Sequence, residues 1–379
     1  MRILLFDLDG VLLEPRGYHR ALRETATLVG QWLGYRRVTL TREDIELFES
    51  VDVTSEWDSA AICAALLLRD AWTISPDLML GSAPPPPDRP THDLPAPDFQ
   101  AFFRSEQMAP ERGTLPTLLA ERSLLSDGGN YSESQVAALR GMLRGARQIH
   151  GSLTHRLFQE MVLGSQVFRD TYGMKPYLPS RDSLLADDRP MLPAAARERL
   201  LNWLRRTDHH AAVFTNRPSE GPQDAIGAPE AELGLAAAEL ELLPLVGRGG
   251  LAWLAEQRGL APDRLLKPSA AHALAALRRA TGEPLEAALR AAAALTLDEQ
   301  GDSGWRVFAG AEIFVFEDSV KGLHSLRAAQ GRLESLGVTC RPILVGVAKS
   351  PHKRQGLEAA GAQMFSDVEQ ALRRSGALA

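Results

Sequence analysis

Cysteine is scarce in this sequence of 379 residues, which contains only two, Cys63 and Cys340. They lie far apart in apolar surroundings, which is typical of small core side chains and not of a disulfide framework or a metal site. The N-terminus lacks the charged, apolar and small-residue order of a signal peptide, because it begins directly with a strand-like apolar run. These features predict a cytoplasmic protein.

Long apolar runs and dense clusters of basic residues are also absent. The longest unbroken apolar stretch, Ala60 to Leu68, is far shorter than a membrane span. Lysine and arginine total 42 against 48 acidic residues, so the net charge is −6. The sequence therefore predicts no membrane and no nucleic-acid partner. A hydrophobic share of 45% and a charged share of 24% are ordinary for a globular protein, and the length allows two domains.

Strand-like apolar runs occur in two separated parts of the chain. The first run, Arg2 to Phe6, is apolar on both faces, which is typical of a strand inside a parallel sheet covered by helices. From Pro193 onward, such runs alternate with helical patterns. The later strands are expected at Ala211–Thr215, Leu240–Val246, Glu312–Phe316, Pro342–Gly346 and Gln363–Phe365, and the helices at Ala194–Thr207, Gly250–Arg258, Ala270–Ala280 and Leu285–Leu297. This alternation predicts an α/β fold with a doubly wound, Rossmann-like parallel sheet.

The region from Pro15 to Met191 shows helical spacing and no convincing strand. Its helices are expected at Tyr18–Leu33, Glu43–Phe48, Ser59–Trp72, Ser132–Arg147 and Leu153–Tyr172. Residues 75–97 form a proline-rich loop, interpreted as a flexible surface loop or a stiff spacer. We therefore expect a discontinuous α/β core, residues 1–14 and 192–379, and a large inserted all-α domain, residues 15–191.

Acidic residues follow two of the predicted strands. Asp7 and Asp9 come after the first strand, and Glu317 and Asp318 come after Ile313–Phe316. Open α/β sheets place their ligands at the carboxyl ends of the strands, so the four carboxylates would converge if these strands are neighbours. They would repel one another without a cation, and oxygen ligands without His or Cys favour Mg²⁺. An Asp-x-Asp-Gly turn is weak evidence alone, and the second acidic pair strengthens it.

Three further residues could bind a phosphate group. Thr215 ends the strand that begins at Ala211, so its hydroxyl group and the backbone N–H of Asn216 can point at a phosphate. Lys267 can supply a positive charge between the phosphate and the nucleophile. Taken singly, Thr215 could merely end a strand and Lys267 could be a solvated loop charge. With the acidic pairs they make up what a phosphoryl transfer centre needs, because positioning and charge stabilisation dominate that reaction.

The four motifs, in this order, resemble those of the haloacid dehalogenase superfamily. They are Phe6-Asp-Leu-Asp-Gly-Val11, Phe214-Thr-Asn-Arg217, Lys267-Pro268 and Phe316-Glu-Asp-Ser-Val-Lys-Gly322, followed by a closing stretch Gly361-Ala-Gln-Met-Phe-Ser-Asp367. The fourth motif is similar to that of the branch that contains β-phosphoglucomutase and phosphoglycolate phosphatase. In that branch a helical cap follows the first motif. The first and second motifs here lie further apart than a simple helical cap requires.

The resemblance implies a role for each residue. Asp7 would attack phosphorus and form an aspartyl-phosphate, and Asp9 would protonate the leaving oxygen and then activate water. Magnesium would be held by Asp7, the backbone carbonyl of Asp9 and Asp318, with Glu317 contributing directly or through water. The phosphate-binding residues would be Thr215, Asn216 and Lys267.

The resemblance implies magnesium-dependent hydrolysis of a small-molecule phosphate monoester. Dehalogenation does not use the acid at Asp9, so phosphate chemistry is favoured over halide displacement. A phosphomutase of the same fold and a non-catalytic binding or regulatory module are the alternatives, and formation of an isomer in place of inorganic phosphate would identify the mutase. The residues specify neither the substrate nor the oligomeric state.

Within the expected helical insertion, the polar segment Asp52-Val-Thr-Ser-Glu-Trp-Asp58 precedes an apolar helix. Its hydroxyl side chains could cap that helix. Alternatively, Glu56, Trp57 or Asp58 could contact the substrate. Lys175 lies near the expected hinge and could bind a phosphate or carboxylate, or be an ordinary exposed lysine.

Overall fold

The computed structural model describes residues 1–81, 83–84, 94–111, 113–178, 180–222, 225 and 227–378. The chain divides into two compact units, of which unit 1 comprises Met1–Pro15 and Asp187–Ala379 and unit 2 comprises Arg16–Ala186. The second boundary lies slightly before the expected one, because β3 (Arg189–Pro190) pairs antiparallel with β2 (Leu13–Glu14) and so belongs to unit 1. Much of the expected proline-rich loop lies outside the described residues.

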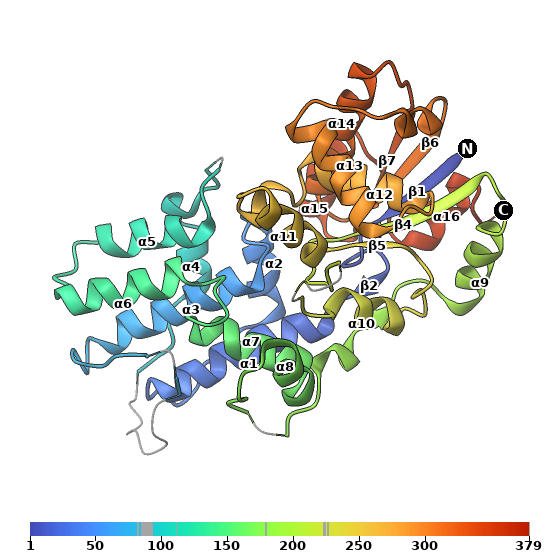
Figure 1. Cartoon of the computed structure of the whole chain (residues 1–379). Coiled ribbons are helices and arrows are strands. Elements are labelled where there is room, and N and C mark those ends of the chain that lie inside the picture. The colour runs from blue at the N-terminus through green and yellow to red at the C-terminus, as the bar shows by residue number, and fades with distance from the viewer. Residues whose placement is uncertain are drawn as a thin grey trace. The chain divides into compact units, whose positions relative to one another are not determined.

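A six-stranded parallel sheet forms the centre of unit 1 (Figure 1). Its order is β5-β4-β1-β6-β7-β8, and every neighbouring pair is parallel. The strands are β1 Arg2–Phe6, β4 His209–Phe214, β5 Leu245–Val246, β6 Glu312–Glu317, β7 Arg341–Val347 and β8 Gln363–Phe365. The predicted α/β fold with a Rossmann-like parallel sheet is confirmed. The strand expected over Leu240–Val246 is shorter than predicted, since only its last two residues pair with β4.

Helices cover both faces of this sheet. The side chains of a strand point to alternate faces, and in β1 Ile3 and Leu5 join one apolar cluster while Leu4 and Phe6 join the other. All four side chains are fully buried. The first cluster contains residues of α11 Arg248–Gln257, α12 Ala270–Ala280, α13 Leu285–Leu297, α14 Val320–Ser335 and α15 Pro351–Ala359, and the second contains residues of α9 Ala194–Trp203, α10 Glu230–Ala237 and α16 Val368–Ser375. Short 3₁₀ turns at Pro262–Arg264 and Ser303–Phe308 complete the unit.

The strand register brings three strand ends together. Phe6 of β1 lies opposite Val213 of β4 on one side and Phe316 of β6 on the other. The residues that follow these positions therefore emerge at the same edge of the sheet, where open α/β folds bind ligands.

Unit 2 contains only helices among its described residues. They are α1 Arg16–Trp32, α2 Arg42–Ser50, α3 Glu56–Ala71, α4 Phe99–Phe103, α5 Pro116–Ser126, α6 Glu133–Arg144, α7 Leu153–Leu163 and α8 Ser165–Tyr172, with 3₁₀ turns at Glu106–Met108 and Leu184–Asp187. The prediction of a single helix over Leu153–Tyr172 is wrong, because Gly164 has φ +77° and separates α7 from α8. None of the helices in the described ranges is long and apolar enough to cross a membrane.

The polar segment Asp52–Asp58 extends into the first turn of α3, and two of its side chains make contacts within unit 2. Ser55 occupies the N-cap position of α3, but its side chain makes no capping hydrogen bond. Asp58 is buried and accepts two hydrogen bonds from Arg147, at 3.0 and 2.7 Å. The Trp57 ring lies 4.3 Å from that of His155. Asp58 is thus an ion-pair partner inside unit 2, because a buried carboxylate needs such a partner.

Candidate active site

Asp7 lies directly after β1, at the centre of the sheet edge. Its backbone N–H donates to the carbonyl of Phe316 at 2.9 Å, which extends the ladder beyond the strand. Its side-chain Oδ1 accepts from the N–H of Leu8 at 2.7 Å and lies 3.0 Å from Nζ of Lys267. The residue is only 9% exposed. The carboxylate is therefore held in one orientation beside a positive charge.

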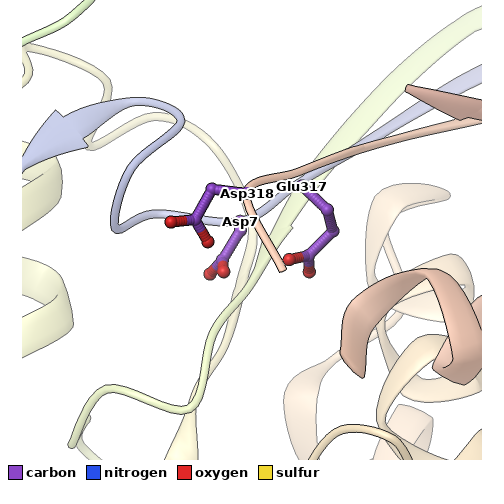
Figure 2. Close-up of side chains that lie close together, drawn as sticks. All are labelled: Asp7, Glu317 and Asp318. Carbon is purple, nitrogen blue, oxygen red and sulfur yellow. The ribbon is translucent and has the colours of Figure 1, made fainter. Parts of the chain in front are cut away.

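Three carboxylates converge at this edge. Single oxygens of Asp7, Glu317 and Asp318 lie within 4.8 Å of one another, and Figure 2 shows the three side chains at the ends of β1 and β6. Glu317 is fully buried, whereas Asp318 is partly exposed and accepts from Nζ of Lys353 at 2.7 Å. The side chain of Asp9, the fourth predicted carboxylate, is not part of this cluster.

Two motif glycines make room for the carboxylates. Gly10 has φ +74°, and a Cβ atom on it would lie 2.4 Å from Oδ2 of Asp318. Gly322 lies in the first turn of α14, and a Cβ atom there would lie 1.7 Å from Oε1 of Glu317. Larger residues at either position would displace a carboxylate of the cluster. The spacing between the acidic residues and these glycines is thus a packing requirement of the site.

Lys267 supplies the positive charge inside the cluster. Its Nζ lies 2.6 Å from Oε1 of Glu317 and 4.0 Å from the ring centre of Phe214. Burial opposes the charged form of Lys267, but Asp7 and Glu317 outweigh it and raise the pKa of the ammonium group. Burial, with the charge of Asp7, raises the pKa of Glu317 well above its usual value, and Lys267 opposes that rise. Lys267 therefore compensates two neighbouring carboxylates at once.

Thr215 follows β4, and its hydroxyl group is oriented by its own loop. The residue is almost fully buried, and Oγ1 accepts from the N–H of Arg217 at 3.2 Å. A hydroxyl group that accepts one hydrogen bond can still donate its hydrogen to a ligand. Asn216 is exposed, and its side-chain Oδ1 accepts from the backbone N–H of Lys267 at 3.2 Å. Asn216 thereby ties the loop after β4 to the loop that carries Lys267.

The side chain of Asp9 pairs with Arg217. Nε and Nη2 of Arg217 donate to the two oxygens of Asp9, at 3.1 and 2.5 Å. The same guanidinium binds Oδ2 of Asp188 through Nη1 and Nη2, both at 3.2 Å. The sequence placed Arg217 in a motif but gave it no role, and it did not single out Asp188 or Lys353. The one sequence signal for a role of Arg217 in the site is its position directly after Thr215 and Asn216.

The donor set fits a hard divalent cation. Asp7, Glu317 and Asp318 offer carboxylate oxygens only, which are the ligands that Mg²⁺ and Ca²⁺ prefer over softer donors. Asp318 lies within ligand reach of Asp7, as convergence of the two acidic pairs on one ion requires.

Comparisons with protein-family models and with curated proteins find no match. Among solved structures, the X-ray structure of Northeast Structural Genomics Consortium target ZR25 is similar, with a TM-score of 0.62, 15% sequence identity and coverage of 99% of each chain. Phosphatase Tt82 from Thermococcus thioreducens gives a TM-score of 0.41 at 14% identity, over 94% of this chain and 99% of that one. The second likeness is too weak to carry an argument. The first shows that this fold occurs over the whole length of another chain.

Proposed function

We propose that this protein is a magnesium-dependent phosphohydrolase of the haloacid dehalogenase type, which acts on a small-molecule phosphate monoester. The observation that carries the proposal is the position of Asp7 at the end of the central strand, 3.0 Å from Lys267 and within 4.8 Å of oxygens of Glu317 and Asp318. A fixed carboxylate nucleophile beside a buried ammonium group and a cation site suits phosphoryl transfer.

In the proposed first step, Asp7 attacks the phosphorus atom. A bond forms between phosphorus and a carboxylate oxygen, the bond to the leaving oxygen breaks, and Asp9 gives its proton to that oxygen. Leu8 N–H and Lys267 both bind Oδ1 of Asp7, so Oδ2 is the attacking oxygen that we propose. The ammonium of Lys267 and the hydroxyl of Thr215 would stabilise the charge on the equatorial oxygens.

In the proposed second step, water attacks the phosphorus of the aspartyl-phosphate. Asp9 accepts a proton from the water, the bond between phosphorus and Asp7 breaks, and inorganic phosphate leaves. Both carboxyl groups then have the protonation state with which they began. This order of events uses each of the two aspartates of the first motif in a different role.

Asp7, Glu317 and Asp318, with the backbone carbonyl of Asp9, are the groups that we propose to hold Mg²⁺. The bound ion supplies positive charge beside the phosphate. The ammonium groups of Lys267 and Lys353 cannot by themselves offset three carboxylates and a phosphate dianion at the same edge.

Hydrolysis of p-nitrophenyl phosphate with and without Mg²⁺ tests the proposal. We expect Asp7→Asn to lower kcat by about 10³-fold or more, because it removes the nucleophile. The matched control, Asp298→Asn, changes an exposed aspartate that pairs with Arg258, and it should keep full activity. Hydroxylamine, which cleaves acyl phosphates, should trap the intermediate on Asp7 in the wild type.

Two results would count against the proposal. An Asp7→Asn variant as active as the wild type would exclude Asp7 as the nucleophile. A wild-type protein that releases no phosphate from sugar phosphates, phosphoglycolate or nucleotides at any magnesium concentration would favour the non-catalytic binding module. Conversion of a sugar phosphate to its isomer without release of phosphate would identify a phosphomutase.

A further inference from the structure

Arg217 is a residue of the site to which the proposed reaction gives no role. We propose that Arg217 is a positioning residue, which fixes the carboxyl group of Asp9 for proton transfer to the leaving oxygen, and that Asp188 in turn fixes Arg217. This inference rests on the proposed function, because it gives Arg217 a role only if Asp9 is the general acid of that reaction.

The contact between Arg217 and Asp9 is a two-point contact. Nε binds Oδ2 at 3.1 Å and Nη2 binds Oδ1 at 2.5 Å, so the guanidinium fixes both the position and the plane of the carboxyl group. The Arg217 side chain is fully buried, whereas that of Asp9 is 30% exposed. The arginine therefore lies behind Asp9, and the aspartate keeps a face toward solvent.

The far side of the guanidinium is enclosed. Asp188, whose side chain is fully buried, binds Nη1 and Nη2 at 3.2 Å, and the carbonyl of Glu230 accepts from Nη1 at 3.4 Å. In α10, a Cβ atom on Gly234 would lie 2.9 Å from Nη1, so a side chain at this position would shift the guanidinium. A buried guanidinium held between two carboxylates has only one position, and this is what a positioning group requires.

The same loop also holds the phosphate side of the site. The backbone N–H of Arg217 donates to Oγ1 of Thr215, the hydroxyl proposed to bind the transferred phosphate. The loop after β4 thus sets the phosphate-binding hydroxyl with its backbone and the acid with its side chain. Each oxygen of Asp9 has a second lone pair, so the contact with Arg217 leaves room for the proton that Asp9 transfers.

Leaving-group dependence separates a positioning role from a structural one. We expect Arg217→Met to lower kcat/KM by about 10²-fold or more for an alkyl phosphate, whose leaving oxygen needs a proton, and by less than about tenfold for p-nitrophenyl phosphate, whose leaving oxygen does not. The kcat/KM value covers the steps up to departure of the leaving group, so later hydrolysis of the intermediate does not affect it. Arg217→Lys should recover only part of the loss, since an ammonium group lacks the two-point geometry.

Asp9→Asn is the reference variant and should show the same substrate pattern. The Asp9→Asn/Arg217→Met double variant should then lose nothing further, because both changes remove one function. If Arg217→Met does not fold, Arg217→Met/Asp188→Asn removes both buried charges and takes its place.

Equal losses for the two substrates, no loss for either, or additive losses in the double variant would overturn the positioning role while leaving the proposed hydrolase intact. A wild-type protein inactive on both esters would instead contradict the proposed function itself.

Discussion

Replacing Lys267 with methionine would leave the buried carboxylate of Glu317 without its ammonium partner. Nζ of Lys267 lies 2.6 Å from Oε1 of Glu317, and Glu317 is 0% exposed. Removal of one member of a buried ion pair costs about 3–5 kcal/mol of folding free energy. Methionine keeps most of the side-chain volume, so the loss would come from the charge and not from a cavity.

The loss should increase with pH. Burial raises the pKa of Glu317 and Lys267 opposes the rise, so the pKa of Glu317 should be still higher in the variant. A group with a raised pKa in the folded state contributes stability that is present below its unfolded pKa, about 4.3 for glutamate, and is lost as pH rises through the folded pKa. Between the unfolded pKa and the folded pKa of Glu317 in the wild type, both proteins lose stability with pH at the same rate. We therefore expect the difference between variant and wild type to widen as pH rises through the folded pKa of Glu317 in the wild type.

Native-state hydrogen exchange of peptides from β1 and β6, in the presence of a chelator, measures the free energy of opening of the unit that holds the pair. The matched control is Lys267→Met/Glu317→Gln, in which neither charge remains. It should recover about 2 kcal/mol or more of the loss, because the uncompensated carboxylate is gone. Additive losses in the double variant, or a loss that does not change with pH, would refute the account of Lys267 as the partner of Glu317.

Three further predictions concern a tightly packed glycine, a carboxyl group with a raised pKa and a buried ion pair. Gly322→Ala would place a Cβ atom 1.7 Å from Oε1 of Glu317. Urea unfolding should therefore show a loss of about 1–3 kcal/mol in the free energy of unfolding, together with loss of phosphatase activity. A variant with wild-type stability and activity would show that the cluster tolerates a side chain there. Burial raises the pKa of Glu232 to about 7. The stability that Glu232 contributes is therefore lost as pH rises from about 4.3 to 7. Glu232→Gln removes this loss, so the free energy of unfolding should fall by about 1–2 kcal/mol less between pH 5 and pH 8 than it does in the wild type. This value is lowered because the side chain is partly exposed. Arg147→Met would leave Asp58 buried without its partner, so hydrogen exchange of α3 peptides should show a loss of about 3–5 kcal/mol, and unchanged protection would contradict the role given to this pair.

The sequence predicts the core of the fold well where both faces of an element are apolar. The strands β1, β6 and β7 could be found because they have no polar face, and α12 and α13 have the predicted bounds because their helical spacing is uninterrupted. The break between α7 and α8 was not predicted. Gly164 can adopt the positive φ that this break requires. A Cβ atom on residue 164 would also lie 2.8 Å from the backbone nitrogen of Ser183, and this close approach cannot be read from the local sequence.

The candidate site could be predicted only in part, for a similar reason. Strand ends identify Asp7 and Glu317, because parallel strands end at one edge whatever lies between them in the sequence. The contact of Arg217 with Asp9 joins two residues that are far apart in the chain, and no periodic pattern encodes it. The same holds for Asp188, which lies beyond the whole of unit 2 in sequence. These side-chain partners are visible only when the chain is folded.

A crystal structure of the protein with Mg²⁺ and beryllium fluoride, an analogue of the aspartyl-phosphate, tests the central claim most directly. The account predicts the fluoroberyllate on a carboxylate oxygen of Asp7, with the ion at about 2.0–2.1 Å from oxygens of Asp7 and Asp318. Fluoroberyllate absent from Asp7, or an ion bound away from these two residues, would contradict it.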